Sequence, residues 1–100
     1  MSSWNYRVIH RKILGRTPEY DEDVYAIHEV YYDDAGKMVA VTTEPVPAYS
    51  ENMKGMGWVL ERFAEAYKKD VVEWDSIPEK GAKPFATAGE DPYDANLDGE

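Results

Sequence analysis

The chain has 100 residues, of which 43% are hydrophobic, 13% aromatic and 31% charged, with a formal net charge of −9 at pH 7. This length predicts a single domain with its own core, and this acidity disfavours direct binding of nucleic acid, because negative surfaces repel phosphate. The absence of cysteine excludes a disulfide framework, a thiolate zinc site and a cysteine nucleophile, and no apolar run is long enough to predict a membrane span.

The first predicted element is a strand over residues 4–12, WNYRVIHRK. Its side chains alternate with a period of two and include aromatic and β-branched types, as is typical of strands. A loop is expected to follow over residues 13–23, which contain glycine, proline and an acid cluster. The alternation predicts one face with Trp4, Tyr6, Val8 and His10 and a second face with Asn5, Arg7, Ile9 and Arg11.

Residues 24–43 are predicted to form a hairpin of two strands. Asp33 and Gly36 supply turn chemistry between them, because aspartate binds nearby backbone amides and glycine adopts positive φ without strain. Both faces of the first strand are rich in apolar groups, which indicates a central position. One face carries Tyr25, Ile27, Glu29 and Tyr31, and the other carries Ala26, His28, Val30 and Tyr32.

A single helix is predicted over residues 51–69, after an extended segment that contains Pro45 and Pro47. Ser50 is the expected N-cap. Gly55 and Gly57 weaken the first turns, because each costs about 1 kcal/mol relative to alanine inside a helix. The expected core-facing stripe is Met53, Met56, Leu60, Phe63 and Tyr67, widened by Val59 and Ala64.

These elements predict an α+β fold, a three-stranded antiparallel sheet packed on one helix in the order β-β-β-α. A short fourth strand or a docked arm is expected near residues 71–74, where Val71, Val72, Trp74 and Ile77 supply apolar groups. Residues 1–78 are expected to form the single domain. Residues 79–100 hold few large apolar groups and an acidic excess, which predicts a disordered tail.

No catalytic, cofactor or metal site is expected. His28 and Glu29 are adjacent on a strand and point to opposite faces, so they cannot act together as acid and base. His10 and His28 could share a metal with a carboxylate if their strands paired suitably, but no helical histidine spacing supports such a site. Asp94, Asn96 and Asp98 match the first half of a calcium loop, and the sequence given ends before the bidentate glutamate.

The aromatic content indicates a contact surface instead. Eight tyrosines and three tryptophans exceed what a small core requires, and tyrosine is enriched at protein interfaces. One sheet face packs under the helix, and the other is expected to remain open to water or a partner. All four basic residues of positions 1–18 precede the first acidic residue of the chain. We expect these basic side chains to pair with carboxylates on neighbouring strands, which stabilises a sheet. The candidate interaction residues are Arg7, Arg11, Tyr25, Tyr31 and Tyr32.

The leading hypothesis is therefore a small cytoplasmic, non-enzymatic protein-interaction module, with an unknown protein or a second copy of the chain as its partner. The alternative from another class is an acidic phage or mobile-element inhibitor that imitates the charge of nucleic acid on a basic target. A metal-binding or enzymatic protein is a third and weaker alternative.

The strings WNYRVIHRK, YAIHEVYYDDAGK and TTEPVPAYSENM, with the helix after them, resemble a group of small, acidic, uncharacterised bacterial and phage-associated proteins. Members share W-N-Y-R-V-I, Y-x-I-H-E-V-Y-Y-D-x-x-G and T-x-x-P-x-x-P, followed by a helix; this chain has T-x-x-P-x-P at residues 42–47 in place of the third motif. The resemblance covers about residues 4–70 and implies no activity, cofactor or partner. The element order also resembles antitoxin domains of the HicB type at the level of fold alone, and no DNA-binding appendage is visible.

Overall fold

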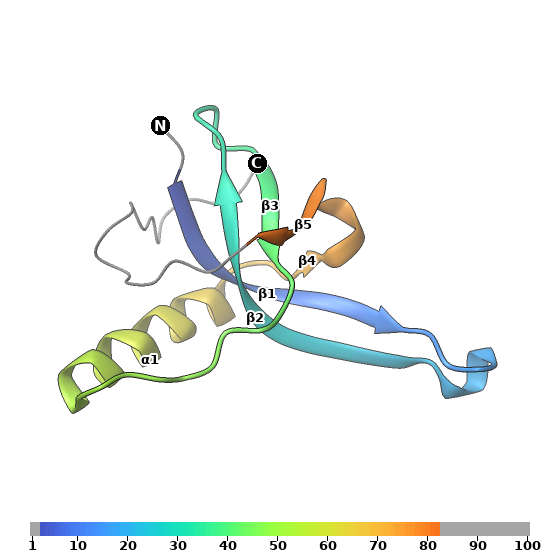
Figure 1. The fold of residues 1–100 in the computed structure, drawn as a ribbon, viewed down its shortest axis with the longest axis horizontal. Coiled ribbons are helices and arrows are strands. Elements are labelled where there is room, and N and C mark those ends of the chain that lie inside the picture. Colours follow the sequence, from blue (N-terminus) through green and yellow to red (C-terminus); the bar gives the residue numbers. More distant parts are fainter. Residues whose placement is uncertain (1–2, 83–100) are drawn as a thin grey trace.

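The computed structural model describes residues 3–82, which form an α+β fold with one helix and a five-stranded mixed sheet (Figure 1). The sheet has the strand order β4-β1-β2-β3-β5. Two 3-10 helices, η1 (Pro18–Tyr20) and η2 (Trp74–Ser76), interrupt the connections. The regular elements are β1 (Ser3–Ile13), β2 (Glu22–Tyr32), β3 (Met38–Thr42), α1 (Met53–Lys68), β4 (Val72–Glu73) and β5 (Glu79–Ala82).

The three predicted antiparallel strands are confirmed as the centre of the sheet. β1 pairs with β2 from Ser3↔Tyr32 to Ile13↔Glu22, and β2 pairs with β3. The short fourth strand expected near residues 71–74 is also present, as β4. The expectation of a wholly antiparallel sheet is wrong, because β4 and a fifth strand, β5, each pair in parallel with an outer edge. β4 pairs with β1 at Ile9↔Val72 and His10↔Glu73, and β5 pairs with β3.

The turn between β2 and β3 has the predicted chemistry. The Asp33 Oδ1 oxygen accepts hydrogen bonds from the backbone N–H groups of Ala35 and Lys37, each at 2.9 Å. Gly36 has φ 82°, which a residue with a Cβ rarely adopts. The local sequence DDAGK therefore closes the hairpin, and this closure fixes the strand register.

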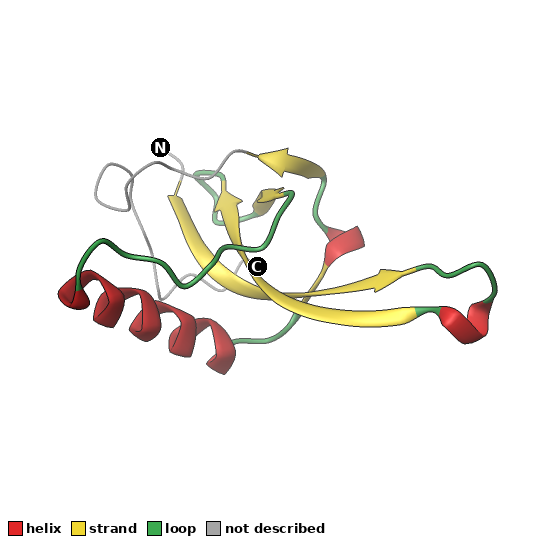
Figure 2. Ribbon diagram, turned by 60° about the horizontal axis from the view of Figure 1, so that its bottom comes forward, coloured by secondary structure: helices red, strands yellow, loops and turns green. Residues whose placement is uncertain are grey.

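The sheet is covered on both faces, so the expectation of one open face is wrong. On one face, α1 packs on β1 through a cluster that contains Trp4, Tyr6 and Ala66. On the other face, the segment after α1 returns across the sheet and places Ile77, 1% exposed, against the strands (Figure 2). This second cluster consists of Ile9, Val30, Tyr32, Val41, Val72 and Ile77, with Met38 and Trp74 beside it.

The helix is confirmed, but its cap and its buried face differ from the prediction. Asn52, not Ser50, caps it, because the Asn52 side chain accepts a hydrogen bond from the Gly55 N–H at 2.7 Å. The buried positions are Val59 and Ala66, with Phe63 half-buried between them. The expected stripe is therefore rotated around the helix, and most of it is in contact with solvent: Met53, Leu60, Ala64 and Tyr67 are all exposed.

The sheet continues past residue 78, the predicted end of the domain. Glu79–Ala82 form β5, and Gly81 within it has φ 95°, a conformation that favours glycine. The first four residues of the predicted tail are thus part of the sheet, held by pairs such as Ala40↔Glu79. The rest of that predicted tail, with Asp94, Asn96 and Asp98, lies outside the described residues.

Candidate functional site

Two of the five predicted contact residues lie in the interior. Arg7 is 2% exposed and donates hydrogen bonds to the Asp70 carbonyl oxygen at 2.8 Å and to the Tyr32 hydroxyl at 3.3 Å. Tyr32 is fully buried and its hydroxyl donates to the Asn5 Oδ1 oxygen at 2.7 Å. The segment that follows α1 covers these side chains, so neither can contact a partner in this fold, and their assignment to a contact surface is wrong.

The other three predicted residues differ in exposure. Tyr31 is half-buried against the helix side, and its hydroxyl donates to the buried Glu29 carboxylate at 2.6 Å. The Arg11 guanidinium lies 4.2 Å from the centroid of the Trp74 ring, a cation–π contact that holds η2 against β1. Tyr25 is 63% exposed. Of the five, Tyr25 alone is exposed, and Arg11, like Tyr31, is half-buried. Arg11 and Tyr25 both lie where the β1–β2 ribbon leaves the body.

This ribbon forms a projecting arm, which we define as residues 11–25 (Figure 2). Beyond His10, no other described strand pairs with β1, and β3 pairs only with the far end of β2. None of residues 11–25 is buried. The arm nevertheless carries five large apolar side chains, with exposed fractions of 42% for Ile13, 76% for Leu14, 68% for Tyr20, 40% for Val24 and 63% for Tyr25.

The tip of the arm is an ordered turn. The Gly15 N–H donates to the Asp21 carboxylate at 2.9 Å, and the Tyr20 N–H donates to the Thr17 carbonyl at 2.9 Å, which closes η1. A side chain at Gly15 would collide with Tyr20, so glycine permits this close approach. The turn thus presents Leu14 and Tyr20 to solvent from a defined backbone.

At its base, the arm is braced by His10. Its Nε2 atom lies 2.8 Å from the Asp23 carboxylate of β2, and its Nδ1 atom lies 2.7 Å from the Glu73 carboxylate of β4. The ring also stacks on Tyr25, with centroids 4.8 Å apart. The hydrogen bonds to Asp23 and then to Glu73 raise the pKa of His10 above 6.5, and the same contact lowers the pKa of Asp23.

This brace predicts a pH-dependent stability. The stabilising contribution of His10 is fully present below its unfolded pKa of 6.5 and is lost as the pH rises through its higher folded pKa. Urea unfolding of wild type and His10→Gln should therefore show a larger stability difference at about pH 5.5 than at about pH 8.5. His28 is common to both proteins, so its own titration cancels in the difference. A pH-independent difference would contradict the ionic role of the brace.

The two histidines do not form a metal site. Because His10 pairs with Tyr25 and His28 pairs with Arg7, the alternation of the strands places the two rings on opposite faces of the sheet. His28 is buried, and its Nδ1 atom lies 2.9 Å from the Thr42 carbonyl oxygen. Burial lowers the pKa of His28. Among residues 3–82, no group of three or more histidine, aspartate or glutamate side chains is arranged to hold a metal ion.

Sequence reasoning missed the arm and the exposed apolar face of α1. A signal for the arm was present in the length of the two strands that flank the predicted loop, because the structure extends them to Ile13 and back to Glu22. The signal on the helix was the width of its apolar face, which exceeds what one sheet can cover. In the part of the chain that the structure describes, no helix has the length and apolar content to cross a membrane.

Comparisons with known proteins give no relative. No family model, no curated protein and no solved structure matches the chain. The resemblance to small acidic bacterial and phage-associated proteins therefore stays a prediction. The candidate site therefore depends on the structure alone: it is the projecting arm, with Arg11 and the His10 brace at its base.

Proposed function

We propose that this protein is a small, non-enzymatic protein-interaction module and that the arm is its contact surface. One observation carries the proposal: residues 11–25 expose five large apolar side chains and bury none. A two-stranded ribbon without a core is marginally stable in water, so such an arm gains stability when a partner covers it. Exposed aromatic residues on a rigid turn are also suited to act as anchors in an interface.

The charges of the arm favour a protein partner of mixed charge. Its β1 strand carries Arg11 and Lys12, and its β2 strand carries Glu22 and Asp23. Lys12 pairs with Asp23 across the ribbon, so the two signs lie side by side. Opposed charges of this kind set the orientation of a partner and exclude wrong partners. A uniformly acidic inhibitor would present one sign of charge, which the arm does not.

The experiment compares the double variant Leu14→Ser/Tyr20→Ser with Tyr49→Ser. The second variant removes a tyrosine that is also exposed, at 69%, but lies outside the arm. All three proteins should fold, because exposed substitutions change stability by about 0.5 kcal/mol or less. The arm variant should bind a protein that co-purifies with wild type from the host more than about tenfold more weakly, measured by calorimetry with the purified partner.

Tyr49→Ser should bind that partner with wild-type affinity. Equal affinity of the arm variant and wild type would contradict the proposal. The same conclusion would follow if no host protein associated with the wild-type chain at a stoichiometric ratio.

A further inference from the structure

The outer face of α1 carries a regular row of apolar residues, which we call the helix row. The row members follow each other at intervals of 4, 3, 4 and 3 residues, so they lie along one line of the helix. Large side chains alternate with small ones along this line. Of the large ones, Met53 is 84% exposed, Leu60 is 53% exposed and Tyr67 is 82% exposed. The row consists of Met53, Gly57, Leu60, Ala64 and Tyr67.

Gly57 is not explained by contacts within the described chain. A Cβ built at Gly57 would meet nothing within 4 Å, whereas a side chain at Gly55 would collide with Ser50. Glycine inside a helix is destabilising relative to alanine, so the fold bears a cost at Gly57 without a steric reason. An open notch between two large apolar side chains is the shape that a side chain of another helix fills.

We propose that α1 pairs with α1 of a second copy in an antiparallel, two-fold symmetric dimer. In the register that places Leu60 over Gly57 of the second copy, Met53 lies over Ala64 of that copy. Each large side chain of these pairs thus meets a small one. The two-fold axis repeats both contacts, so the surface is self-complementary, as an isologous interface requires.

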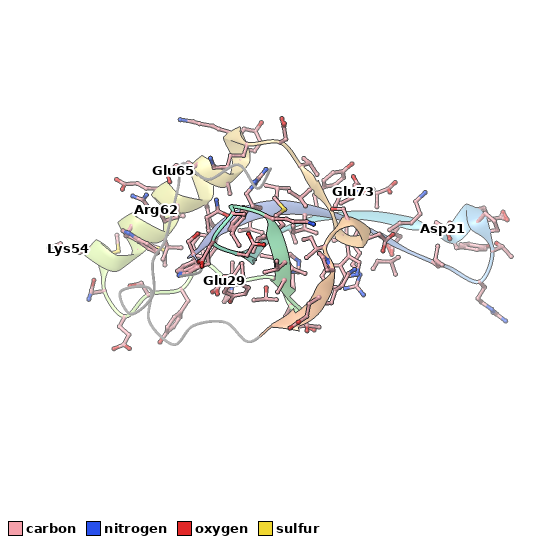
Figure 3. The ribbon with its side chains drawn as sticks, turned by 90° about the horizontal axis from the view of Figure 1, so that it is seen from above. Asp21, Glu29, Lys54, Arg62, Glu65 and Glu73 are labelled. Atoms are coloured by element: carbon pink, nitrogen blue, oxygen red, sulfur yellow. The ribbon has the colours of Figure 1, made fainter. Side chains whose placement is uncertain are left out.

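The same register matches the charges beside the helix row. Lys54 and Glu61 lie one residue after Met53 and Leu60, on the solvent side of the row. In an antiparallel pair, equivalent flanks of the two helices face each other. Lys54 of each copy is then next to Glu61 of the other, which gives two ion pairs. Lys54 is exposed near the start of α1 (Figure 3). The Glu61 side chain is 73% exposed, and its carboxylate lies 3.6 Å from the guanidinium of Arg62.

A parallel pair fits less well. It would place Gly57 on Gly57 and Leu60 on Leu60, so the notches would face each other and remain unfilled. Met56 and Phe63 are half-buried and lie on the sheet side of the row. In the antiparallel pair, Met56 of each copy faces Phe63 of the other, and a parallel pair does not make this apolar contact. The contact is limited to a helix of 16 residues, about 24 Å long, so we expect a weak dimer that forms with rising concentration.

Sedimentation equilibrium of the full chain tests the proposal with Gly57→Leu. The space at Gly57 is open in the single copy, so the variant should fold at least as well as wild type by circular dichroism and thermal unfolding. In the dimer, the new side chain collides with Leu60 of the second copy, and association should be lost. Lys68→Leu, an exposed substitution on the same helix beyond the contact, should leave the dimer intact.

A charge exchange tests the register. Lys54→Glu should weaken the dimer by roughly tenfold, because both ion pairs become repulsive. The double variant Lys54→Glu/Glu61→Lys should restore association to near the wild-type level, and added salt should reduce the difference between the two. A single variant that associates as wild type does, or a double variant that fails to recover, would overturn the register.

The orientation is tested with one spin label per chain, since the protein has no cysteine. At Lys68→Cys, an antiparallel pair in this register places the two labels about 30 Å apart, and a parallel pair places them about 10 Å apart. The short distance would overturn the proposal, as would a strictly monomeric chain at millimolar concentration. A dimer that persists in Gly57→Leu but is lost in Leu14→Ser/Tyr20→Ser would place self-association on the arm instead.

Discussion

Trp4→Ala should destabilise the fold by about 3–5 kcal/mol, the usual range for truncation of a buried tryptophan. Trp4 is 1% exposed and lies between the sheet and α1. Its ring meets Tyr6 edge to face, with centroids 5.2 Å apart. Because domains are stable by only about 5–15 kcal/mol, this loss is a large fraction of the total. Urea unfolding monitored by helical circular dichroism measures it.

Tyr67→Ala is the matched control for Trp4→Ala. It removes a large aromatic side chain from the outer face of α1, where the Tyr67 ring is 82% exposed. We expect a change of about 0.5 kcal/mol or less. If both variants lost equal stability, the helix would not pack on the sheet through the face that contains Ala66.

Ile77→Ala should cost about 2–5 kcal/mol, although Ile77 lies outside the three strands and the helix that sequence patterns predict. The side chain is 1% exposed and packs in the cluster with Ile9 and Val41 on the sheet face away from α1. Its removal leaves a cavity that the short neighbouring strands cannot close without moving. The urea concentration at the midpoint of unfolding should fall, whereas the dependence of the unfolding free energy on urea concentration should change little.

Val71→Ala is the control for Ile77→Ala. Val71 lies in the same returning segment but is 48% exposed, so its truncation should be nearly neutral. Equal and small effects of both substitutions would contradict a core on the second face of the sheet. That result would also contradict the docked arm that sequence patterns allow over residues 70–78.

The central meander could be predicted because its signals are local. The alternation of β1 and the turn from Asp33 to Gly36 fix the strand faces and the hairpin register without reference to distant residues. The faces assigned to Trp4 and to His28 are therefore correct. The helix was predictable in extent for the same reason, since its periodicity continues for several turns.

The outer strands could not be predicted with the same security. β4 pairs only two residues with β1, and His10 and Glu73, joined there, are 63 positions apart in the chain. β5 contains glycine and lysine, which are poor strand formers, and is held by parallel pairing with β3. The residue pattern within one segment does not show which distant strand that segment pairs with, or whether the pairing is parallel. Arg7 and Tyr32 were wrongly assigned to the surface for the same reason: sequence patterns predict a strand or docked arm after the helix, but not that it covers these two side chains.

The helix row shows why a correct helix gave a wrong buried face. Apolar residues occupy both the sheet side, with Val59, and the outer side, with Leu60. Periodicity alone cannot decide which line of a broad apolar face meets the core. The structure is needed to show that the line with Val59 packs on the sheet and that the line with Leu60 is exposed.

The parallel pairing of β4 with β1 has a consequence for synthesis on the ribosome. The first strand to be made acquires its outer neighbour only when residues 63 positions later have been added. At translation rates of about 5–20 residues per second, this takes roughly 3–13 s. During that interval the nascent chain presents an open β edge, and it is then that capture by a chaperone or by another nascent chain has its best opportunity.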